Sequence, residues 1–222
     1  MTYTLTLQEI APVTPDTHKL TFNRPDGFTF ESGQATELTL PIKGLQDESR
    51  PFTMTSRPND AHLEFVIKSY DDHDGVTKHI PELGMTDQVK AAEPFGAITD
   101  HGPGVFIAGG AGITPFISIL RKQQQEGKSG AQLIFANKSP EDIILREMWQ
   151  SMPNVDETFV VADANGTDLR EGMVDKALLE DLVTELDQPF YICGPGPMVD
   201  SVRDALKEIG VAEDRIITED GW

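Results

Sequence analysis

The stretch VFIAGGAGITPFISIL, residues 105–120, decides the fold of the second half of the chain. An apolar run typical of a buried strand ends in Gly109, Gly110 and Gly112, and a helical pattern starts at about Pro115. Glycines let the backbone bend and let a ligand approach, and the free N–H groups of a helix N-terminus bind anions. The turn lacks the third glycine of G-x-G-x-x-G, and no Lys-Ser/Thr pair follows, which excludes a P-loop. Such a turn can also be glycine-rich for geometry alone.

The rest of the second half repeats this alternation of apolar strands and helical patterns. Strands are predicted at 105–109, 131–137, 157–163 and 189–194, and helices at about 115–126, 140–150, 173–185 and 197–209. This alternation predicts βαβ units and a parallel sheet. A second strand ends in a small-residue turn within YICGPGPMVDSV, residues 191–202. Two such turns at the carboxyl ends of parallel strands line one ligand-binding crevice.

The first half instead contains short stretches in which polar and apolar residues alternate. They lie at 3–10, 18–24, 34–41 and 62–70, separated by clusters of Pro, Gly, Asn and Asp, and 75–83 is predicted as a short helix. Period-2 strands with such turns predict an antiparallel barrel or sandwich. The pattern changes near residue 100, so we expect a β domain over 1–100 and an α/β domain over 101–222.

The composition of the chain disfavours several classes of function. The 222 residues carry a formal net charge of −19, which disfavours nucleic acid and anionic lipid as partners; solubility is the ordinary reason for such acidity. No apolar run approaches the roughly 20 residues of a membrane span, and the N-terminus alternates like a strand, unlike a signal peptide, so we expect a cytoplasmic protein. The one cysteine, Cys193, excludes a disulfide framework and an iron–sulfur cluster held by this chain's own cysteines. The five histidines show no ligand spacing, so no metal is expected.

A third group of polar residues lies in the β domain, in SRPFTMTS, residues 49–56. Arg50 carries a guanidinium fork that matches a pair of phosphate oxygens, Phe52 a flat apolar face, and Thr53 a short polar donor. Further on, Gly75, Val76 and Thr77 open the predicted short helix, a second place for a phosphate. Taken singly, a strand-borne arginine is more often part of a surface ion pair.

Together these motifs resemble the ferredoxin–NADP reductase superfamily of flavoenzymes, in its compact bacterial form. The motifs also occur in the order found in that superfamily. They are an Arg-x-aromatic-Ser/Thr motif at 50–53, a small-residue turn at 75–77, GGAGITP at 109–115 and CGPGPM at 193–198. The resemblance covers essentially the whole chain. It implies an antiparallel Greek-key β-barrel that binds FAD, followed by a Rossmann-like parallel-sheet domain that binds NAD(P)H.

The resemblance also implies roles for individual residues of the β domain. Arg50 would bind the flavin pyrophosphate, Phe52 would pack on the isoalloxazine, and Thr53 would hydrogen-bond near its reactive nitrogen. The other residues that the resemblance assigns to the FAD site are Pro51, Lys68, Gly75, Val76 and Thr77.

In the α/β domain the resemblance assigns the coenzyme and the edge of the nicotinamide. The coenzyme residues would be Gly110, Gly112, Thr114, Pro115, Cys193, Gly194, Pro195 and Met198. Thr53 and Cys193 would act by positioning the reacting groups, while Glu219 is a candidate proton source near the flavin. Trp222 could cover the isoalloxazine or be an ordinary tail residue.

The resemblance implies an enzyme that transfers a hydride from NAD(P)H to FAD and passes electrons to a separate carrier such as ferredoxin or flavodoxin. Two alternatives remain open, namely a reductase of free flavins or quinones and a flavoprotein subunit without independent turnover. The coenzyme is also open. In ANKSPED, residues 136–142, Lys138 and Ser139 could hold the NADP phosphate, whereas Glu141 and Asp142 would repel it.

Overall fold

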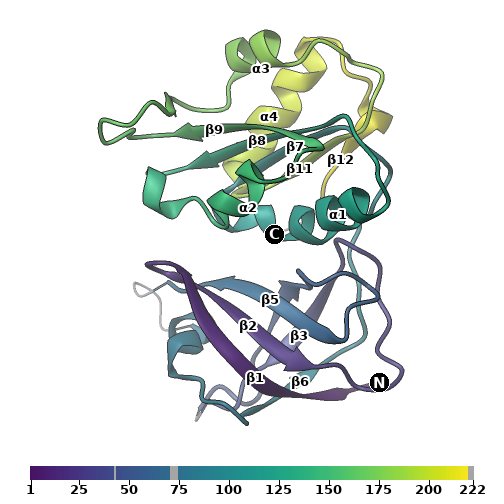
Figure 1. Ribbon diagram of the computed structural model, residues 1–222, viewed down its shortest axis with the longest axis vertical. Helices are drawn as coiled ribbons and strands as arrows, with labels where there is room; N and C mark the ends of the chain where they lie inside the picture. The colour runs from purple at the N-terminus through teal and green to yellow at the C-terminus, as the bar shows by residue number, and fades with distance from the viewer. Residues whose placement is uncertain (43, 71–74, 220–222) are drawn as a thin grey trace. The chain divides into compact units, whose positions relative to one another are not determined.

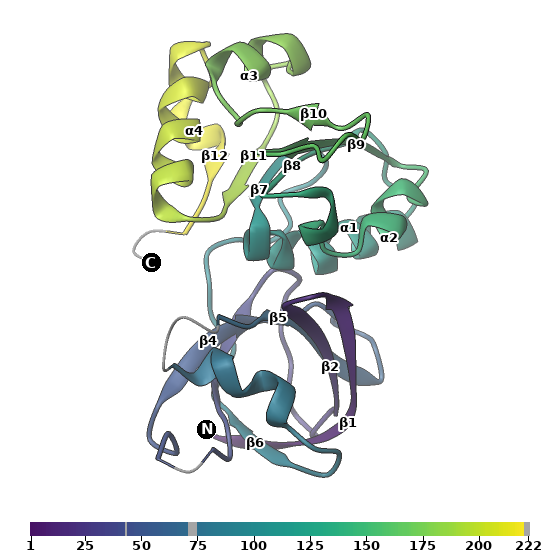
Figure 2. The same cartoon turned by 90° about the vertical axis from the view of Figure 1, so that its left-hand side faces the viewer.

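The alternating stretches of the first half form a six-stranded antiparallel sheet with the order β4-β3-β6-β1-β2-β5. Its strands are β1 (Tyr3–Thr14), β2 (Thr17–Asn23), β3 (Ala35–Thr39), β4 (Ser49–Thr53), β5 (His62–Lys68) and β6 (Gln88–Ala91). The two edge strands meet after β4, where Met54 pairs with Phe65 and the Thr55 N–H donates to the Glu64 carbonyl at 2.8 Å. The sheet therefore closes into the expected barrel (Figure 2).

The connections of the barrel are those of a Greek key. β2 is followed in the chain by β3, which lies beyond β1 and β6 in the sheet. The barrel encloses apolar residues from alternate strand positions, among them Leu5, Leu20, Phe22 and Phe65, all fully buried. The 3-10 helix η1 (Val76–Glu82) contributes Val76 and Ile80 to the same core, and it corresponds to the predicted short helix.

The second half forms a six-stranded sheet with the order β10-β9-β8-β7-β11-β12, and its strands pair in parallel. The strands are β7 (Val105–Gly109), β8 (Ala131–Asn137), β9 (Val155–Val161), β10 (Arg170–Glu171), β11 (Phe190–Cys193) and β12 (Ile216–Ile217). From β7 the chain proceeds outward through β8 and β9, and it then returns to place β11 on the other side of β7. The strand order thus reverses between β7 and β11, and this is where open α/β sheets bind ligands.

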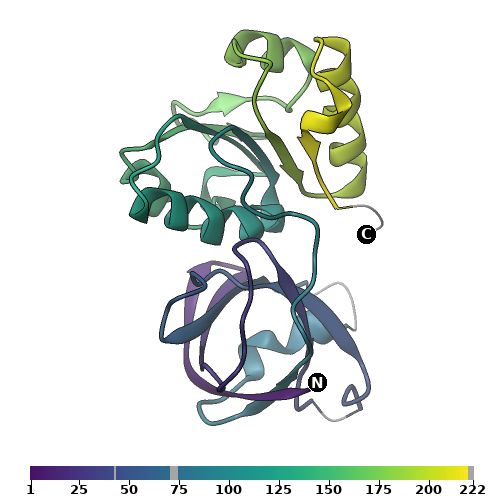
Figure 3. The ribbon, with the colours of Figure 1, turned by 90° about the vertical axis from the view of Figure 1, so that its right-hand side faces the viewer.

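Helices cover both faces of this parallel sheet, as Figures 1 and 3 show. They are α1 (Thr114–Gln125), α2 (Arg146–Gln150), α3 (Lys176–Leu182) and α4 (Gly196–Glu208), together with the short 3-10 helices η2 (Gly110–Ile113), η3 (Pro140–Asp142) and η4 (Glu213–Arg215). α1 and α2 lie on one face, and α3 and α4 lie on the other. The fold class expected from the sequence, a Greek-key barrel followed by a Rossmann-like domain, is confirmed.

Several features of the second half differ from the prediction. The short strands β10 and β12 had no prediction, and the helix expected over 173–185 is confined to α3 at Lys176–Leu182. The helix expected over 140–150 is divided into η3 and α2, because Leu145 between them adopts a left-handed backbone with φ of 56°. The strand expected at 157–163 starts and ends two residues earlier, at Val155–Val161. In the first half, β6 had no separate prediction, although it joins β1 to β3 in the barrel.

The structure describes residues 1–42, 44–70 and 75–219. By its internal contacts the chain divides into one unit of Met1–Asp100 with Thr114–Ile119, and a second unit of His101–Ile113 with the chain from Leu120 onward. The first half of α1 therefore groups with the barrel. None of the helices in the described part of the chain combines the length and the hydropathy that a membrane crossing requires.

Candidate functional site

Strand β4 places the Arg-x-aromatic-Thr motif on the barrel. Arg50 is about half exposed, and its Nη2 donates to Glu48 Oε2 at 2.9 Å. Phe52 is partly buried and packs against the barrel core, and Thr53 is half-buried. An exposed ion pair such as Arg50–Glu48 stabilises a protein by only about 0–1 kcal/mol, so the guanidinium can exchange this carboxylate for a phosphate at little cost.

The small-residue turn before η1 offers backbone groups to a ligand. Gly75 is extended, with φ of −103°, and the helix that follows it has no side-chain cap. A Cβ at Gly75 would meet no other atom within 4 Å, so the space beside the backbone is open in the described structure. Val76 is anchored in the barrel core and Thr77 is half-buried, which leaves this turn compatible with the predicted phosphate contact.

Lys68 is engaged in a different network from the one expected. Its Nζ lies 2.7 Å from Asp16 Oδ2, and Asp16 Oδ1 accepts hydrogen bonds from the hydroxyls of Thr14 and Thr17. Burial by itself raises the pKa of the Asp16 carboxyl, but the hydrogen bonds from Lys68, Thr14 and Thr17 outweigh it and hold that pKa below its ordinary value. Lys68 therefore ties β5 to the β1–β2 turn, and its contact with FAD stays a prediction.

The two glycines of the β7–α1 turn have different physical roles. Gly110 has a left-handed backbone, with φ of 52°, and a Cβ there would meet nothing within 4 Å. Gly112 has no such conformation, but a Cβ there would overlap the carbonyl of Cys193 and would lie 2.5 Å from the Gly194 nitrogen. Gly110 thus permits the turn, whereas Gly112 permits the close approach of this turn to the end of β11.

The turn after β11 is packed equally closely against β7. Cys193 pairs in register with Ala108, and a Cβ on Gly194 would lie 3.1 Å from the Gly109 nitrogen. A Cβ on Gly109 would overlap Met198 Sδ and lie 3.0 Å from Pro195 Cδ. The structure therefore brings the two predicted small-residue turns together at the switch point of the sheet.

The N-terminus of α1 begins at this junction. Thr114 is its first residue, Pro115 is the second, and Ile113 before them provides no side-chain cap. The dipole of α1 favours negative charge at this end of the helix. This arrangement fits the pyrophosphate of a nicotinamide coenzyme.

Cys193 holds a neutral thiol at the end of β11. Burial of the thiol raises its pKa to about 12, and the charge of Glu219 adds to the rise, while a hydrogen bond from the Gly194 backbone opposes it. The residue as a whole remains partly exposed. The structure thus places Glu219 within electrostatic reach of Cys193, and a thiol of this kind does not ionise at neutral pH. The positioning role of Cys193 stays a prediction. Trp222 lies outside the described residues.

We expect Cys193 to react about a thousand-fold more slowly with iodoacetamide at pH 8 than an unfolded cysteine, because only the thiolate reacts. The unfolded thiol ionises at about pH 8.5 and the folded thiol at about 12, so folding stability falls as the pH rises between these values. Mass spectrometry of one labelled thiol per chain, with and without urea, measures both rates. Equal rates would show that the folded thiol is ionised and accessible.

The end of β8 and the residues after it form the segment whose sequence leaves the preference between NADH and NADPH open. The Asp142 carboxylate accepts hydrogen bonds from the Ser139 hydroxyl at 2.9 Å and from the Ser139 backbone N–H at 3.1 Å. Glu141 Oε2 lies 3.2 Å from the same hydroxyl. The Oδ1 atom of Asn137 is buried and has no hydrogen-bond partner in the described structure, so it can accept a hydrogen bond from a ligand.

Two contacts of this region were not predicted from the sequence. Gly109 was assigned to the turn but not to the contact with Met198, because that contact joins segments far apart in the chain. Ser118 had a signal that could have been used, since it is a lone hydroxyl in the apolar run PFISIL and is fully buried.

Comparisons with known proteins agree with this arrangement. Residues 2–104 match the model of an FAD-binding domain, and residues 106–204 match that of an oxidoreductase NAD-binding domain. The chain is 30% identical to NADH-cytochrome b5 reductase 1 of Laccaria bicolor, covering 91% of this chain and 71% of that protein. It is also 30% identical to the reductase component of propane 2-monooxygenase from Rhodococcus jostii (strain RHA1), covering 93% of this chain but only 60% of that protein's length.

A solved structure supports the fold. The ferredoxin NADP+ reductase of Neisseria gonorrhoeae with bound FAD and NADP superposes with a TM-score of 0.85 at 21% identity, covering 100% of this chain and 99% of that one. The residues of both sites described above thus lie on a scaffold on which a protein of this fold binds both cofactors.

Proposed function

The chain belongs to the ferredoxin–NADP reductase superfamily, and on that premise we propose that it is an NADH-dependent flavoprotein reductase that passes electrons to a separate acceptor protein. The observation that carries the proposal is the junction of the Gly112 and Cys193 turns, where the N-terminus of α1 begins at the switch point of the parallel sheet. We further propose that the FAD and nicotinamide domains divide at residues 100 and 101 and that the enzyme acts in the cytoplasm.

The protein's own residues bind and orient the cofactors. When bound, FAD supplies the redox chemistry, because it accepts a hydride and can release electrons one at a time. Arg50 and the turn at Gly75–Thr77 hold the FAD pyrophosphate, and Phe52 packs against the flavin ring. Gly110, Thr114 and Pro115 hold the coenzyme pyrophosphate.

The acceptor in this proposal is another protein. With one cysteine, these 222 residues cannot ligate an iron–sulfur cluster through their own thiolates, so the proposed acceptor lies outside them. The similarity to the reductase component of a monooxygenase and to cytochrome b5 reductases supports a protein acceptor, of which ferredoxin and flavodoxin are further candidates.

The proposal of NADH as the electron donor rests on the end of β8. The Ser139 hydroxyl and N–H are both bound to the Asp142 carboxylate, and Glu141 adds a second negative charge beside them. The 2′-phosphate of NADPH would lie near two carboxylates and one adjacent cation, Lys138. The net repulsion makes NADPH binding unfavourable. The ribose hydroxyl of NADH carries no such charge.

We expect purified, FAD-loaded protein to be reduced by NADH in a stopped-flow experiment, with kcat/KM at least about 10-fold higher than for NADPH when an artificial acceptor is added. Glu141→Lys should raise kcat/KM for NADPH by about 10-fold, because it replaces repulsion of the phosphate by attraction. Glu147→Lys is the matched control, since Glu147 is an exposed residue of α2 and undergoes the same change of charge.

A different experimental result would contradict each part of the proposal. A protein that holds FAD but oxidises neither coenzyme is a flavoprotein subunit without turnover. A protein that binds no flavin after reconstitution would contradict the flavin site itself. If NADPH is preferred, or if Glu147→Lys improves its use as much as Glu141→Lys, the coenzyme assignment is wrong.

A further inference from the structure

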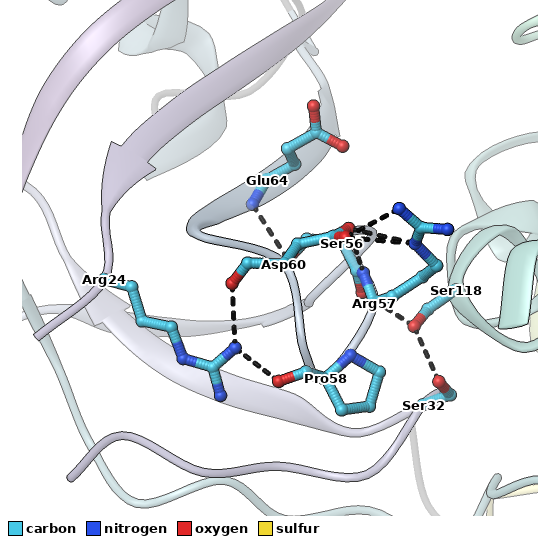
Figure 4. Close-up of polar contacts among 8 residues, drawn as sticks. All are labelled: Arg24, Ser32, Ser56, Arg57, Pro58, Asp60, Glu64 and Ser118. Carbon is cyan, nitrogen blue, oxygen red and sulfur yellow. Dashed lines mark hydrogen bonds and ion pairs between the residues drawn. The ribbon is translucent and has the colours of Figure 1, made fainter. Parts of the chain in front are cut away.

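Three buried serines form a connected hydrogen-bond group in the first unit, shown in Figure 4. Ser118, Ser32 and Ser56 expose 0%, 2% and 1% of their surface. Ser118 Oγ lies 2.7 Å from the Ser56 carbonyl oxygen and 3.0 Å from Ser32 Oγ. Since a hydroxyl has one proton, Ser118 donates to the nearer Ser56 carbonyl and can accept the proton of Ser32.

This group connects two segments that the proposed function assigns to different cofactors. Ser118 lies on α1, one helical turn after Thr114 and therefore on the same side of the helix as the first residue of the coenzyme phosphate site. Ser56 follows Thr53 of the flavin strand by three residues, with Met54 and Thr55 fully buried between them. The hydrogen bond from Ser118 to Ser56 thus joins the start of α1 to the chain that continues from β4.

The Ser56 segment is itself held firmly. Its hydroxyl accepts a hydrogen bond from the Glu64 N–H at 3.1 Å. Arg57, the next residue, is paired through its side chain and its backbone N–H with Asp60, and Arg24 donates to the Asp60 and Pro58 carbonyls. Ser118 is therefore anchored to a segment with little freedom to follow it.

The loop on the other side of Ser118 is shaped to receive the helix. Gly33 follows Ser32 and has a left-handed backbone, with φ of 99°. A Cβ there would overlap the Ile98 carbonyl and would lie 3.0 Å from Ile119 Cδ1 of α1. The absence of a side chain at Gly33 thus allows the loop to lie against α1 at the turn that carries Ser118.

Packing alone does not account for a serine at this position. Its neighbours Phe116, Ile117, Ile119 and Leu120 are all buried, and serine is a poorer helix former than alanine or leucine. A buried hydroxyl without a hydrogen bond destabilises a protein, so Ser118 is favourable only because of its two partners.

We propose that Ser118 is a positioning residue for electron transfer from the coenzyme, acting through its hydrogen bonds to Ser56 and Ser32, an inference that rests on the proposed reductase function. It touches neither cofactor in this assignment. Its hydroxyl fixes the first turn of α1, which carries Thr114 and Pro115, against the segment that follows the flavin strand. Small displacements of a reacting group reduce rates strongly, so loss of this anchor should be visible in the rate.

The test compares Ser118→Ala with Thr36→Val in the FAD-loaded 222-residue protein, by stopped-flow reduction with NADH. Thr36 is the matched control because its fully buried hydroxyl also donates to a backbone carbonyl, that of Ala92, at 2.9 Å. Both variants should lose a similar amount of thermal stability. Only Ser118→Ala should lower the limiting rate of flavin reduction, by about 10-fold, with less than about a threefold change in the NADH dissociation constant.

Ser32→Ala provides a second variant, since it retains the bond from Ser118 to Ser56, and should lower the rate by only about two- to threefold. It also keeps the inference testable if Ser118→Ala does not fold. Equal rates in Ser118→Ala, Thr36→Val and wild type would overturn the inference, as would a loss confined to NADH affinity. Absence of reduction in the wild-type protein would instead contradict the proposed function.

Discussion

Arg50→Ala is expected to bind FAD about 10- to 150-fold more weakly than the wild-type protein, because it removes hydrogen bonds between a charged donor and the pyrophosphate, which contribute about 1.5–3 kcal/mol. In the described structure Arg50 is half exposed on β4, and its guanidinium donates to Glu48 at 2.9 Å and to the Ser49 carbonyl at 2.8 Å. The exposed ion pair with Glu48 is weak, so the guanidinium can exchange that carboxylate for a phosphate. Flavin fluorescence during titration of the apoprotein with FAD measures the dissociation constant.

Arg170→Ala controls for the loss of an exposed arginine. Arg170 on β10 pairs with Asp181 at 2.8 Å, and the side chains of this pair are well exposed, like those of Arg50 and Glu48. This variant should bind FAD like the wild-type protein and lose at most about 1 kcal/mol of stability. If the two variants bind FAD equally well, Arg50 has no part in the flavin site.

Local sequence patterns predicted most of the architecture. β7 and β8 have the predicted bounds because each is an apolar run that ends in residues unfavourable for a strand. The prediction of one helix over 140–150 was wrong because Leu145 has a left-handed backbone, which interrupts the helical hydrogen bonding. The hydrophobic periodicity of the sequence does not indicate such a residue. β6 is four residues long, and its place between β1 and β3 depends on pairing with distant strands.

The site was predictable in its parts, but the contacts between those parts were not. Both glycine turns follow from the sequence, whereas the different roles of Gly110 and Gly112 depend on a backbone angle and on the proximity of Cys193. The ion pair of Lys68 with Asp16 in the β1–β2 connection was not predicted, and the contact of Lys68 with FAD stays a prediction. A local sequence pattern does not indicate which distant residue a side chain contacts.

Gly112→Ala is expected to lower NADH-driven flavin reduction about 100-fold or more while FAD remains bound. The added methyl group would overlap the Cys193 carbonyl and lie 2.5 Å from the Gly194 nitrogen. Since both are backbone atoms, no side-chain rotation relieves the overlap, and the β7 and β11 turns must separate at the point where the coenzyme site begins. Overpacking of this kind destabilises a protein by about 1–3 kcal/mol, and a displacement of about 1 Å can cost a factor of 100 in rate.

Gly196→Ala separates this effect from that of a methyl group as such. Gly196 is the first residue of α4, in the neighbouring turn, and a Cβ there would meet nothing within 4 Å. Its midpoint of urea denaturation should equal that of the wild-type protein, whereas Gly112→Ala should unfold at lower urea. If Gly112→Ala keeps both its stability and its rate of reduction by NADH, the two turns can separate without consequence, and their close contact is not what builds the coenzyme site.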